Sequence, residues 1–144
     1  MKEKTMFVIK PDGYFNREKI KEDISVYFEI IQTTLLDFDL ELIDKLYPMD
    51  LGKSHYPALL EYMLEAPCEL GIIQGESVIK YFFEFVGKYS DPRICAKNTL
   101  RYKYGGGVDS TKSGLLILKN AIHRSKSKEE FEYEFNLFKS YNII

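Results

Sequence analysis

The stretch that most constrains the fold of this chain is the turn Lys10-Pro11-Asp12-Gly13. A β-prone run from Thr5 to Ile9 precedes it, and the chain has to turn where proline and glycine follow that run. After the turn, apolar residues recur at helical spacing opposite a charged face, at Ile20, Ile24, Tyr27, Phe28 and Ile31. The chain is therefore predicted to begin with a strand, a tight turn and a helix.

Alternation predicts the next strand. Apolar residues at every second position alternate with acidic residues over residues 36–42, which is typical of a strand with one face in water. Asp50 is placed to cap a helix from Leu51 to about Tyr56, and Pro57 to open a second short helix. A small helical hairpin is therefore expected after this strand.

The middle of the chain repeats the order of strand and helix. Cys68 to Gln74 is predicted to form a buried strand, and the apolar stripe over residues 78–86 predicts a helix that Gly87 ends. Residues 88–116 are rich in Gly, Ser, Lys and Tyr and are predicted to form a long irregular connection. A loop of that length inside a compact domain is usually functional or mobile.

The C-terminal part is predicted to be a strand followed by a helix. Leu115 to Leu118 and Ala121 to His123 supply apolar residues for a strand that carries a histidine. Ser127 with Glu130 three residues later forms a capping-box signature for a last helix. The buried face of that helix is predicted to carry Phe131, Phe135 and Phe138.

This order of elements predicts an α+β fold, an antiparallel sheet covered by helices on one face. We expect one domain over residues 1–144, because 45% of the residues are hydrophobic and can fill a core. The net charge of -2 offers no broad basic surface, so neither nucleic acid nor a membrane is an expected partner. Two cysteines without metal-ligand spacing, and no signal-peptide core, favour a cytoplasmic protein.

His123 and Glu134 form the candidate for chemistry. At about 100 degrees per residue, Glu134 lies about 60 degrees from Phe131 and about 40 degrees from Phe138, within the apolar stripe. A buried carboxylate needs a partner, and the ring of His123 is the nearest one in sequence. The alternative is that Glu134 reaches the rim or a lysine. If it binds one ring nitrogen of His123, the other nitrogen is oriented as a nucleophile.

Two motifs resemble those of nucleoside diphosphate kinases. They are Lys10-Pro11-Asp12-Gly13, and Asn120-x-Ile122-His123-x-Ser125-x-Ser127 with a glutamate eleven residues after the histidine. Shorter matches stand between them in the order of the family: His55-Tyr56, Glu61-Tyr62-Met63 with Pro67, Gln74-Gly75-Glu76, and Pro92 with Thr99-Leu100-Arg101. The resemblance spans about the whole chain.

The resemblance implies a ferredoxin-like βαββαβ sandwich and a ping-pong transfer of the γ-phosphate from a nucleoside triphosphate to a nucleoside diphosphate. It implies Mg²⁺ carried by the nucleotide phosphates, with no metal ligand from the protein, and a homo-oligomer. His123 would carry the phosphate, Glu134 would orient its ring and Ser125 would support it. The positions that match contacts to the ribose, the phosphates and the base are Lys10, Asn120, Tyr56, Arg101, Ser90 and Ile117.

The chain departs from the family pattern at the phosphates. Phe83 or Glu84 stands where the family has a phosphate-binding arginine, and Lys88 or Arg93 is a possible substitute. Phosphoryl transfer depends on positioning and on neutralising the oxygens, so the missing cation predicts weaker nucleotide affinity.

The base site departs from the pattern as well. The helical hairpin looks shorter than in the family, with no base-stacking phenylalanine, and the loop from Tyr102 to Gly114 looks longer. We therefore expect a more open base site and a broad or altered base preference. The rival hypothesis is a weakly active or inactive relative that serves as a nucleotide-binding or assembly module. A nucleic-acid-binding module is the third possibility, which the acidic balance disfavours.

Overall fold

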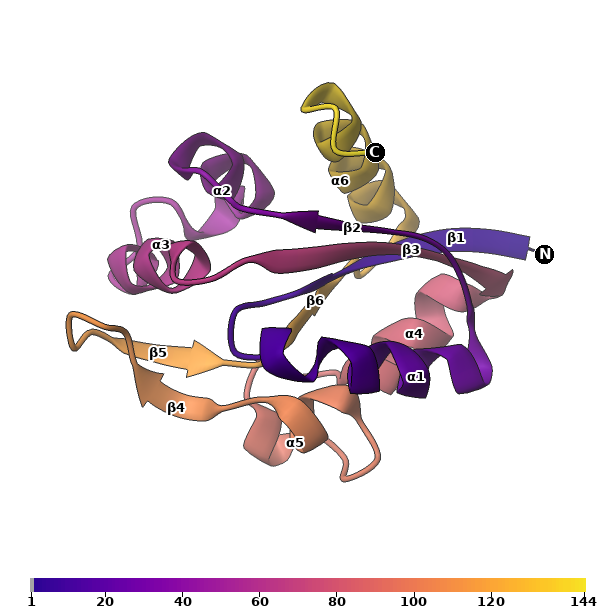
Figure 1. The fold of residues 1–144 in the computed structure, drawn as a ribbon, viewed down its shortest axis with the longest axis horizontal. Coiled ribbons are helices and arrows are strands. Elements are labelled where there is room, and N and C mark those ends of the chain that lie inside the picture. Colours follow the sequence, from indigo (N-terminus) through magenta and orange to yellow (C-terminus); the bar gives the residue numbers. More distant parts are fainter. Residues whose placement is uncertain (1) are drawn as a thin grey trace.

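The computed structural model of the protein describes residues 2–144. Its main sheet has four antiparallel strands in the order β2-β3-β1-β6, and β4 pairs with β5 in a separate hairpin (Figure 1). This is the ferredoxin-like βαββαβ order, which confirms the predicted fold class. The elements are β1 Lys2–Ile9, α1 Arg17–Tyr27, β2 Glu29–Leu36, α2 Leu40–Leu46, α3 Tyr56–Leu64, β3 Cys68–Glu76, α4 Val78–Val86, α5 Leu100–Tyr104, β4 Gly107–Ser110, β5 Leu116–Lys119, β6 Ile122–Arg124 and α6 Lys128–Ser140.

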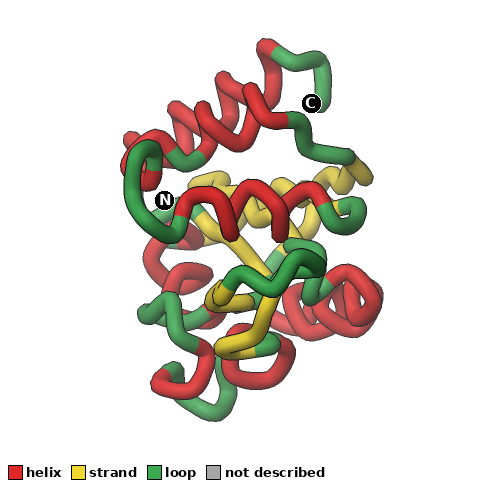
Figure 2. Tube along the Cα trace, turned by 90° about the vertical axis from the view of Figure 1, so that its left-hand side faces the viewer, coloured by secondary structure: helices red, strands yellow, loops and turns green. Residues whose placement is uncertain are grey.

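Helices cover both faces of the sheet, so the prediction of one covered face was wrong (Figure 2). Met6 and Val8 of β1 pack into a core with residues of α2, α3 and α6. Phe7 and Ile9 point to the other side, into a core with residues of α1 and α4. A strand that is buried on both faces carries a continuous apolar run instead of an alternating one. The run from Met6 to Ile9 was the signal for two covered faces.

The predicted strand over residues 36–42 is also wrong. The second strand, β2, ends at Leu36, and Leu40 begins the helix α2. The carboxylate of Asp39 caps α2 by accepting the N–H of Leu42 at 2.8 Å. The buried residues of α2 then follow helical spacing, at Leu42, Ile43 and Leu46. The end of the first predicted helix shifts too, because α1 stops at Tyr27 and Ile31 lies in β2.

The predicted helical hairpin exists, but its elements lie elsewhere. No helix covers residues 51–55, which precede α3, and Asp50 closes a short 3₁₀ turn, Pro48–Asp50. Gly52 has φ 79°, a left-handed conformation that an α-helix does not contain. The hairpin is therefore made of α2 and α3, and Pro57 stands in the first turn of α3 as predicted.

Residues 88–116 are more ordered than predicted. They contain the 3₁₀ turn Pro92–Ile94, the helix α5 and the strand β4. The tip of the β4–β5 hairpin lies against α3, where the N–H of Lys112 donates to Glu65 at 2.9 Å and that of Ser113 to Glu61 at 2.7 Å. The apolar residues 115–123 thus form two strands in different sheets, β5 in the hairpin and β6 beside β1.

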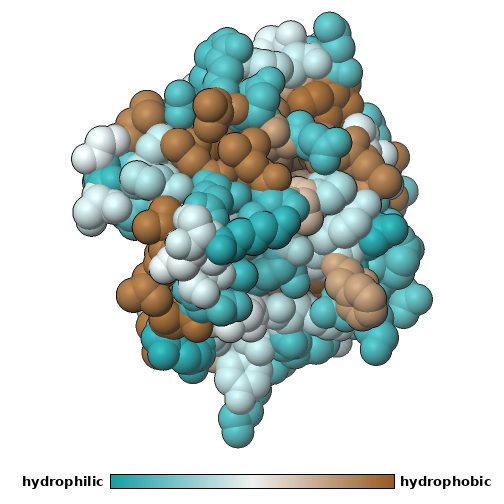
Figure 3. Space-filling view, turned by 60° about the vertical axis from the view of Figure 1, so that its left-hand side comes forward, coloured by the Kyte–Doolittle hydropathy of each residue, from teal (hydrophilic) through white to brown (hydrophobic). Residues whose placement is uncertain are grey.

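The last helix begins as predicted, because Ser127 Oγ accepts the N–H of Glu130 at 3.1 Å. Phe138 is buried in the core, and Phe131 and Phe135 pack partly buried against it. Within residues 2–144 no helix is long and apolar enough to cross a membrane. Hydrophobic residues do reach the surface, in patches between hydrophilic residues (Figure 3). Some apolar surface is therefore left for contacts outside this chain.

The closest packing in the sheet is at Gly71 of β3, which pairs with Phe7 of β1. A Cβ atom at Gly71 would overlap the ring of Phe7, which is fully buried against Phe82. We expect Gly71→Ala to lower the free energy of unfolding by about 1–3 kcal/mol, the usual cost of overpacking. Urea denaturation measures this difference.

Gly75→Ala is the matched control for that substitution. Gly75 lies in the same strand, and the nearest atom to an added Cβ is Val78 Cβ at 3.9 Å, an ordinary contact. This variant should unfold within about 0.5 kcal/mol of the wild type. If the two variants lost the same free energy of unfolding, the ring of Phe7 would not be what limits the space beside β3.

Candidate functional site

A cavity of about 590 Å³ opens at the edge of the main sheet, beside β6. The edge strand β6, the helices α5 and α6 and the segment after α2 all contribute to its wall. Its lining residues are Lys10, Leu46, Tyr47, Pro48, Met49, Asp50, Ser90, Arg101, Asn120, His123, Arg124, Lys126, Glu129, Glu130, Tyr133 and Glu134. The candidate residues His123, Glu134, Lys10, Arg101, Asn120 and Ser90 are therefore brought together from distant parts of the chain.

His123 is held by one of its two ring nitrogens. Its Nε2 lies 2.7 Å from Oε2 of Glu134, and Ser125 Oγ donates to Oε1 of the same carboxylate at 2.6 Å. The ring of Tyr47 packs edge-on against the imidazole, 5.5 Å between centroids. No hydrogen bond among residues 2–144 engages Nδ1 of His123, so this nitrogen is the one left for chemistry.

Glu134 is ionised although it is buried. Burial alone would raise the pKa of its carboxyl, but attraction to His123 and hydrogen bonds from His123 and Ser125 outweigh burial and hold the pKa below its usual value. Its side chain is 3% exposed, so it neither reaches the rim nor meets a lysine. The alternative left open by the sequence is excluded. Because an ionised carboxylate only accepts hydrogen bonds, Nε2 of His123 carries a proton, and in the neutral form of the ring Nδ1 has the lone pair.

A strained bend leads into β6 and sets the direction of His123. The N–H of Ile122 donates to the carbonyl of Asn120 at 2.8 Å across Ala121, which has φ 69°. This is a γ-turn, a tight and uncommon conformation for a residue with a Cβ. The N–H of Ala121 donates to the carboxylate of Asp12 at 3.1–3.2 Å. The bend is therefore fixed to the Lys10–Gly13 turn, where β1 ends.

Lys10 lies at that end of β1, buried, with its Nζ donating to Oδ1 of Asn120 at 2.9 Å. Burial, and after it the positive charge of Arg101, lower the pKa of the amine to about 7. Arg101 on α5 is buried as well and donates to the carbonyls of Ile122 and Tyr89. Burial lowers its pKa, but a guanidinium stays charged at neutral pH.

Asn120 and Ser90 complete this part of the wall. Asn120 Nδ2 donates to the carbonyl of Ser90 at 3.1 Å, which ties the loop after α4 to the bend. The amide of Asn120 thus bridges Lys10 and Ser90. Ser90 itself is exposed, so its hydroxyl is accessible at the cavity mouth.

Two of the predicted nucleotide-binding residues do not line the cavity. Tyr56 packs into the core beside α2, and its hydroxyl donates to Asp44. Ile117 of β5 is buried in the same core. Tyr47 stands in the cavity wall instead, between His123 and Lys10, whose Nζ lies 5.6 Å from the ring centre.

Tyr47 was missed because residues 36–42 were interpreted as a strand. A helix over residues 40–46 places Tyr47 four residues after the buried Ile43, on the face that points inward. Burial raises the pKa of the phenol well above its usual value, so the hydroxyl stays protonated. Its oxygen has no hydrogen-bond partner among the described residues.

His123, Glu130 and Glu134 could be considered a metal site, since one ligand atom of each lies within 4.8 Å of the others. However, the ligand atoms of these side chains already take part in hydrogen bonds. Glu134 binds His123 and Ser125, and Oε1 of Glu130 accepts the N–H of Lys126 at 2.9 Å. The group therefore forms an internal hydrogen-bonded network and offers few free lone pairs to an ion.

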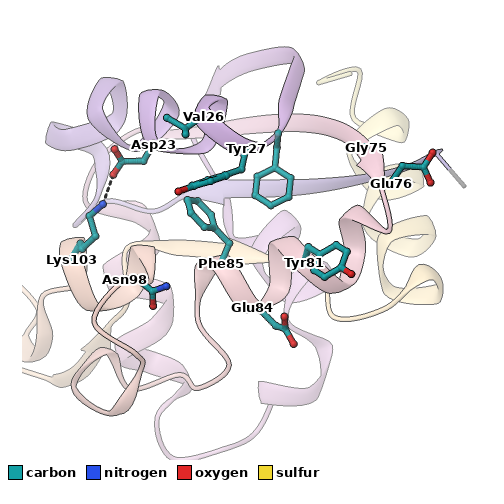
Figure 4. A pocket seen from close by; sticks show the side chains of 11 residues that line it. Asp23, Val26, Tyr27, Gly75, Glu76, Tyr81, Glu84, Phe85, Asn98 and Lys103 are labelled. Atoms are coloured by element: carbon teal, nitrogen blue, oxygen red, sulfur yellow. Dashed lines mark hydrogen bonds and ion pairs between the residues drawn. The ribbon is translucent and has the colours of Figure 1, made fainter.

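A larger hollow of about 800 Å³ lies between α1 and α4 (Figure 4). The rings of Tyr27 and Phe85 meet there edge-on, 5.6 Å between centroids. Lys103 lies at its edge but is paired with Asp23 at 2.8 Å. With Asp23, Glu76 and Glu84 in its lining, this hollow is unsuited to phosphate. The smaller cavity at His123 is therefore the candidate active site.

The comparisons with known proteins agree with this geometry. A family model described as nucleoside diphosphate kinase matches residues 3–143. Similar proteins with that name include one from Pyrococcus furiosus, 31% identical over 94% of this chain and 82% of its own length. Another comes from Methanocaldococcus jannaschii, 30% identical over 96% of this chain and 94% of its own length.

A solved structure gives the same result for the fold. The orthorhombic crystal form of the Aquifex aeolicus nucleoside diphosphate kinase superimposes with a TM-score of 0.79 and 27% sequence identity. The match covers 100% of this chain and 99% of that one. This chain therefore belongs to the nucleoside diphosphate kinase family and is a nucleotide phosphotransferase.

Proposed function

We propose that this chain moves the γ-phosphate of a nucleoside triphosphate to a nucleoside diphosphate through a phosphohistidine at Nδ1 of His123. The observation that carries the proposal is the buried, ionised Glu134 on Nε2, which leaves Nδ1 with its lone pair facing a cavity lined by cations. A nucleophile held by a charged acceptor on its far side is the arrangement that covalent catalysis requires.

Each half-reaction exchanges one bond. Nδ1 attacks the γ-phosphorus, a nitrogen–phosphorus bond forms and the bond to the bridging oxygen breaks, so the nucleoside diphosphate leaves with that electron pair. The ring then holds a proton on Nε2 and a positive charge that the carboxylate of Glu134 neutralises. An acceptor diphosphate reverses these steps with its terminal oxygen. Ser125 keeps Glu134 in place throughout.

Lys10, Arg101, Asn120 and Ser90 bind the nucleotide in this proposal, and Tyr47 takes the place that the resemblance suggested for Tyr56. Amine, guanidinium, amide and hydroxyl groups neutralise or donate to the equatorial oxygens of the transferring phosphate. A role for Tyr56 at the phosphates and a role for Ile117 at the base stay predictions from the resemblance.

Mg²⁺ enters on the nucleotide phosphates in this proposal. The cavity suits a metal–nucleotide complex because its lining includes the exposed carboxylate of Glu129 as well as the cations. Mg²⁺ is usually bound through one or two carboxylates, waters and phosphate oxygens. When bound, the ion neutralises charge that develops on the β- and γ-phosphates. The buried and unpaired Cys68 and Cys95 fit the reducing cytoplasm, where we place the enzyme.

Labelled Mg-ATP should convert the wild type to an acid-labile, alkali-stable phosphoprotein that discharges onto an added nucleoside diphosphate. His123→Ala should take up no label. Glu134→Gln should label about 10²- to 10⁴-fold more slowly, because the amide cannot neutralise the phosphorylated ring. Rapid-quench measurement of label against time gives both results. An unlabelled wild type would favour the rival hypothesis of a nucleotide-binding or assembly module.

Lys10 gives a second prediction. Its pKa of about 7 leaves the amine mostly uncharged at pH 8 in the free protein. A bound phosphate favours the charged form and raises that pKa, so ADP binding at pH 8 should take up close to one proton. The uptake should fade below about pH 7, where the free amine is already protonated.

Titration calorimetry of ADP in two buffers of different ionisation enthalpy, neither of them phosphate, measures this proton. Lys10→Arg is the control. Because a guanidinium is charged before and after binding, this variant should take up almost no protons when ADP binds. Equal binding enthalpies for the wild type in both buffers at pH 8 would contradict a neutral Lys10.

We also propose that copies of this chain associate through the free edge of β2. This strand ends the sheet, and an unpaired edge is a template for another strand. Ile31 and Leu35 on β2 are 40% and 56% exposed, and Val26 and Tyr27 of α1 nearby are 70% and 73% exposed. An exposed edge with apolar neighbours favours a second copy as the partner.

Leu35→Lys should therefore shift the protein toward the monomer, because a charge beside the edge opposes pairing. Size-exclusion chromatography with light scattering gives the mass. Leu116→Lys makes the same change at a 74% exposed leucine of the β4–β5 hairpin and should leave the mass unchanged. A wild type that runs as a monomer at all concentrations would refute the association.

A further inference from the structure

Phe83 of α4 occupies one of the two positions where the resemblance places a phosphate-binding arginine. The side chain that lies on its ring is itself an arginine. The Cζ atom of Arg124 is 4.2 Å from the centre of the Phe83 ring, a stacked cation–π contact. The chain therefore keeps a guanidinium at this place, supplied by β6 instead of α4.

The guanidinium of Arg124 is buried but only partly satisfied. Arg124 is 5% exposed, one terminal nitrogen donates to the carbonyl of Gly87 at 2.9 Å, and Nε has no partner among the described residues. Burial, and then repulsion from Arg101, lower its pKa to about 10, so it is charged at neutral pH. Glu130 and Glu134 attract this charge, but no salt bridge to Arg124 occurs among the described residues, so this buried cation keeps a free donor for an anion.

Arg124 belongs to the wall of the His123 cavity, together with Lys10 and Arg101. The positive charges of Arg101 and Arg124 both lower the pKa of Lys10, so the three cations act on the same space. Side chains alternate along a strand, which turns Arg124 to the opposite face from His123. Since β6 is the edge strand, Arg124 nevertheless lines the cavity from that side.

The two substitutes considered from the sequence lie elsewhere. Arg93 is exposed and its guanidinium is paired with the carboxylate of Asp91 at 2.7–3.2 Å. Lys88 lines a separate groove beside α4 and does not line the cavity. Neither side chain faces His123.

We propose that Arg124 binds the phosphates of the nucleotide and replaces the arginine missing from α4, with Phe83 as the surface on which its guanidinium rests. The inference rests on the proposed function, because it names a further residue for the same phosphate site. On this proposal the site is not short of a cation, contrary to the expectation drawn from the missing α4 arginine. The competing role is structural, a link from β6 to the carbonyl of Gly87.

The test compares ADP binding by calorimetry in variants of matched chemistry. Arg124→Gln keeps a long side chain with an amide donor for Gly87 but removes the charge. This variant should bind ADP about 10- to 100-fold more weakly, which is the affinity that a charged hydrogen bond to phosphate usually contributes. Arg93→Gln makes the same change at the rival arginine and should bind ADP within about twofold of the wild type.

An exchange variant distinguishes phosphate binding from a structural role. Phe83→Arg combined with Arg124→Gln returns an arginine to α4, and it should recover at least about tenfold of the lost affinity. A merely structural arginine predicts the opposite: thermal stability falls in Arg124→Gln, ADP affinity stays within about twofold, and the exchange restores nothing. If Arg124→Gln does not fold, Arg124→Lys replaces it, with an expected loss of about fivefold because lysine lacks the planar fork.

ADP binding does not require turnover, so this test is independent of the phosphohistidine. Suppose that the wild type takes up label from Mg-ATP and the Arg124→Gln variant binds ADP normally. This result would refute the role of Arg124 and leave the proposed catalysis intact. Suppose instead that the wild type takes up no label but its ADP affinity still depends on Arg124. This result would refute the proposed catalysis and support the contact of Arg124 with phosphate.

Discussion

The carboxylate of Asp12 holds the parts of the candidate active site in register. It accepts the N–H groups of Ala121 and Gly106 and the hydroxyl of Tyr62, from the bend before β6, the start of the hairpin and α3. Charged acceptors make the stronger hydrogen bonds in proteins. The end of β1, with Lys10, and the start of β6 are thereby locked together. The distance between the Lys10 amine and the His123 ring follows from this anchor together with the pairing of β1 with β6.

Charge is buried in two different ways around this anchor. Glu134 is fully matched by His123 and Ser125, so its burial is compensated inside the protein. Arg101 and Arg124 lower the pKa of Lys10, and Arg101 lowers that of Arg124. No carboxylate among the described residues pairs with these three side chains at salt-bridge distance. Their repulsion is a standing cost that an anion in the cavity removes. The site is thus complementary to phosphate before any nucleotide arrives.

Much of the fold and the pairing of His123 with Glu134 followed from periodicity in the sequence. Glu134 was found because helical spacing placed an acid on an apolar face. The helix α2 was missed because its apolar residues also alternate with acids, and the cap at Asp39 decides the conformation only through the backbone. Tyr47 was lost with that helix. The sequence did not indicate Arg124 as a site residue for another reason. Strand alternation turns its side chain away from His123, and only the position of β6 at the sheet edge brings it to the cavity.

The γ-turn at Ala121 has a consequence for which residues this position can accept. Alanine at φ 69° carries strain of roughly 1–2 kcal/mol that glycine would not. Glycine would in turn give the unfolded chain more freedom, which costs roughly 0.4–1 kcal/mol. The strain is the larger of the two effects, so stability alone slightly favours glycine at this position. Alanine in return allows the bend fewer conformations, which narrows the range of orientations open to His123. The alanine therefore restricts the backbone that carries His123, at a small cost in stability.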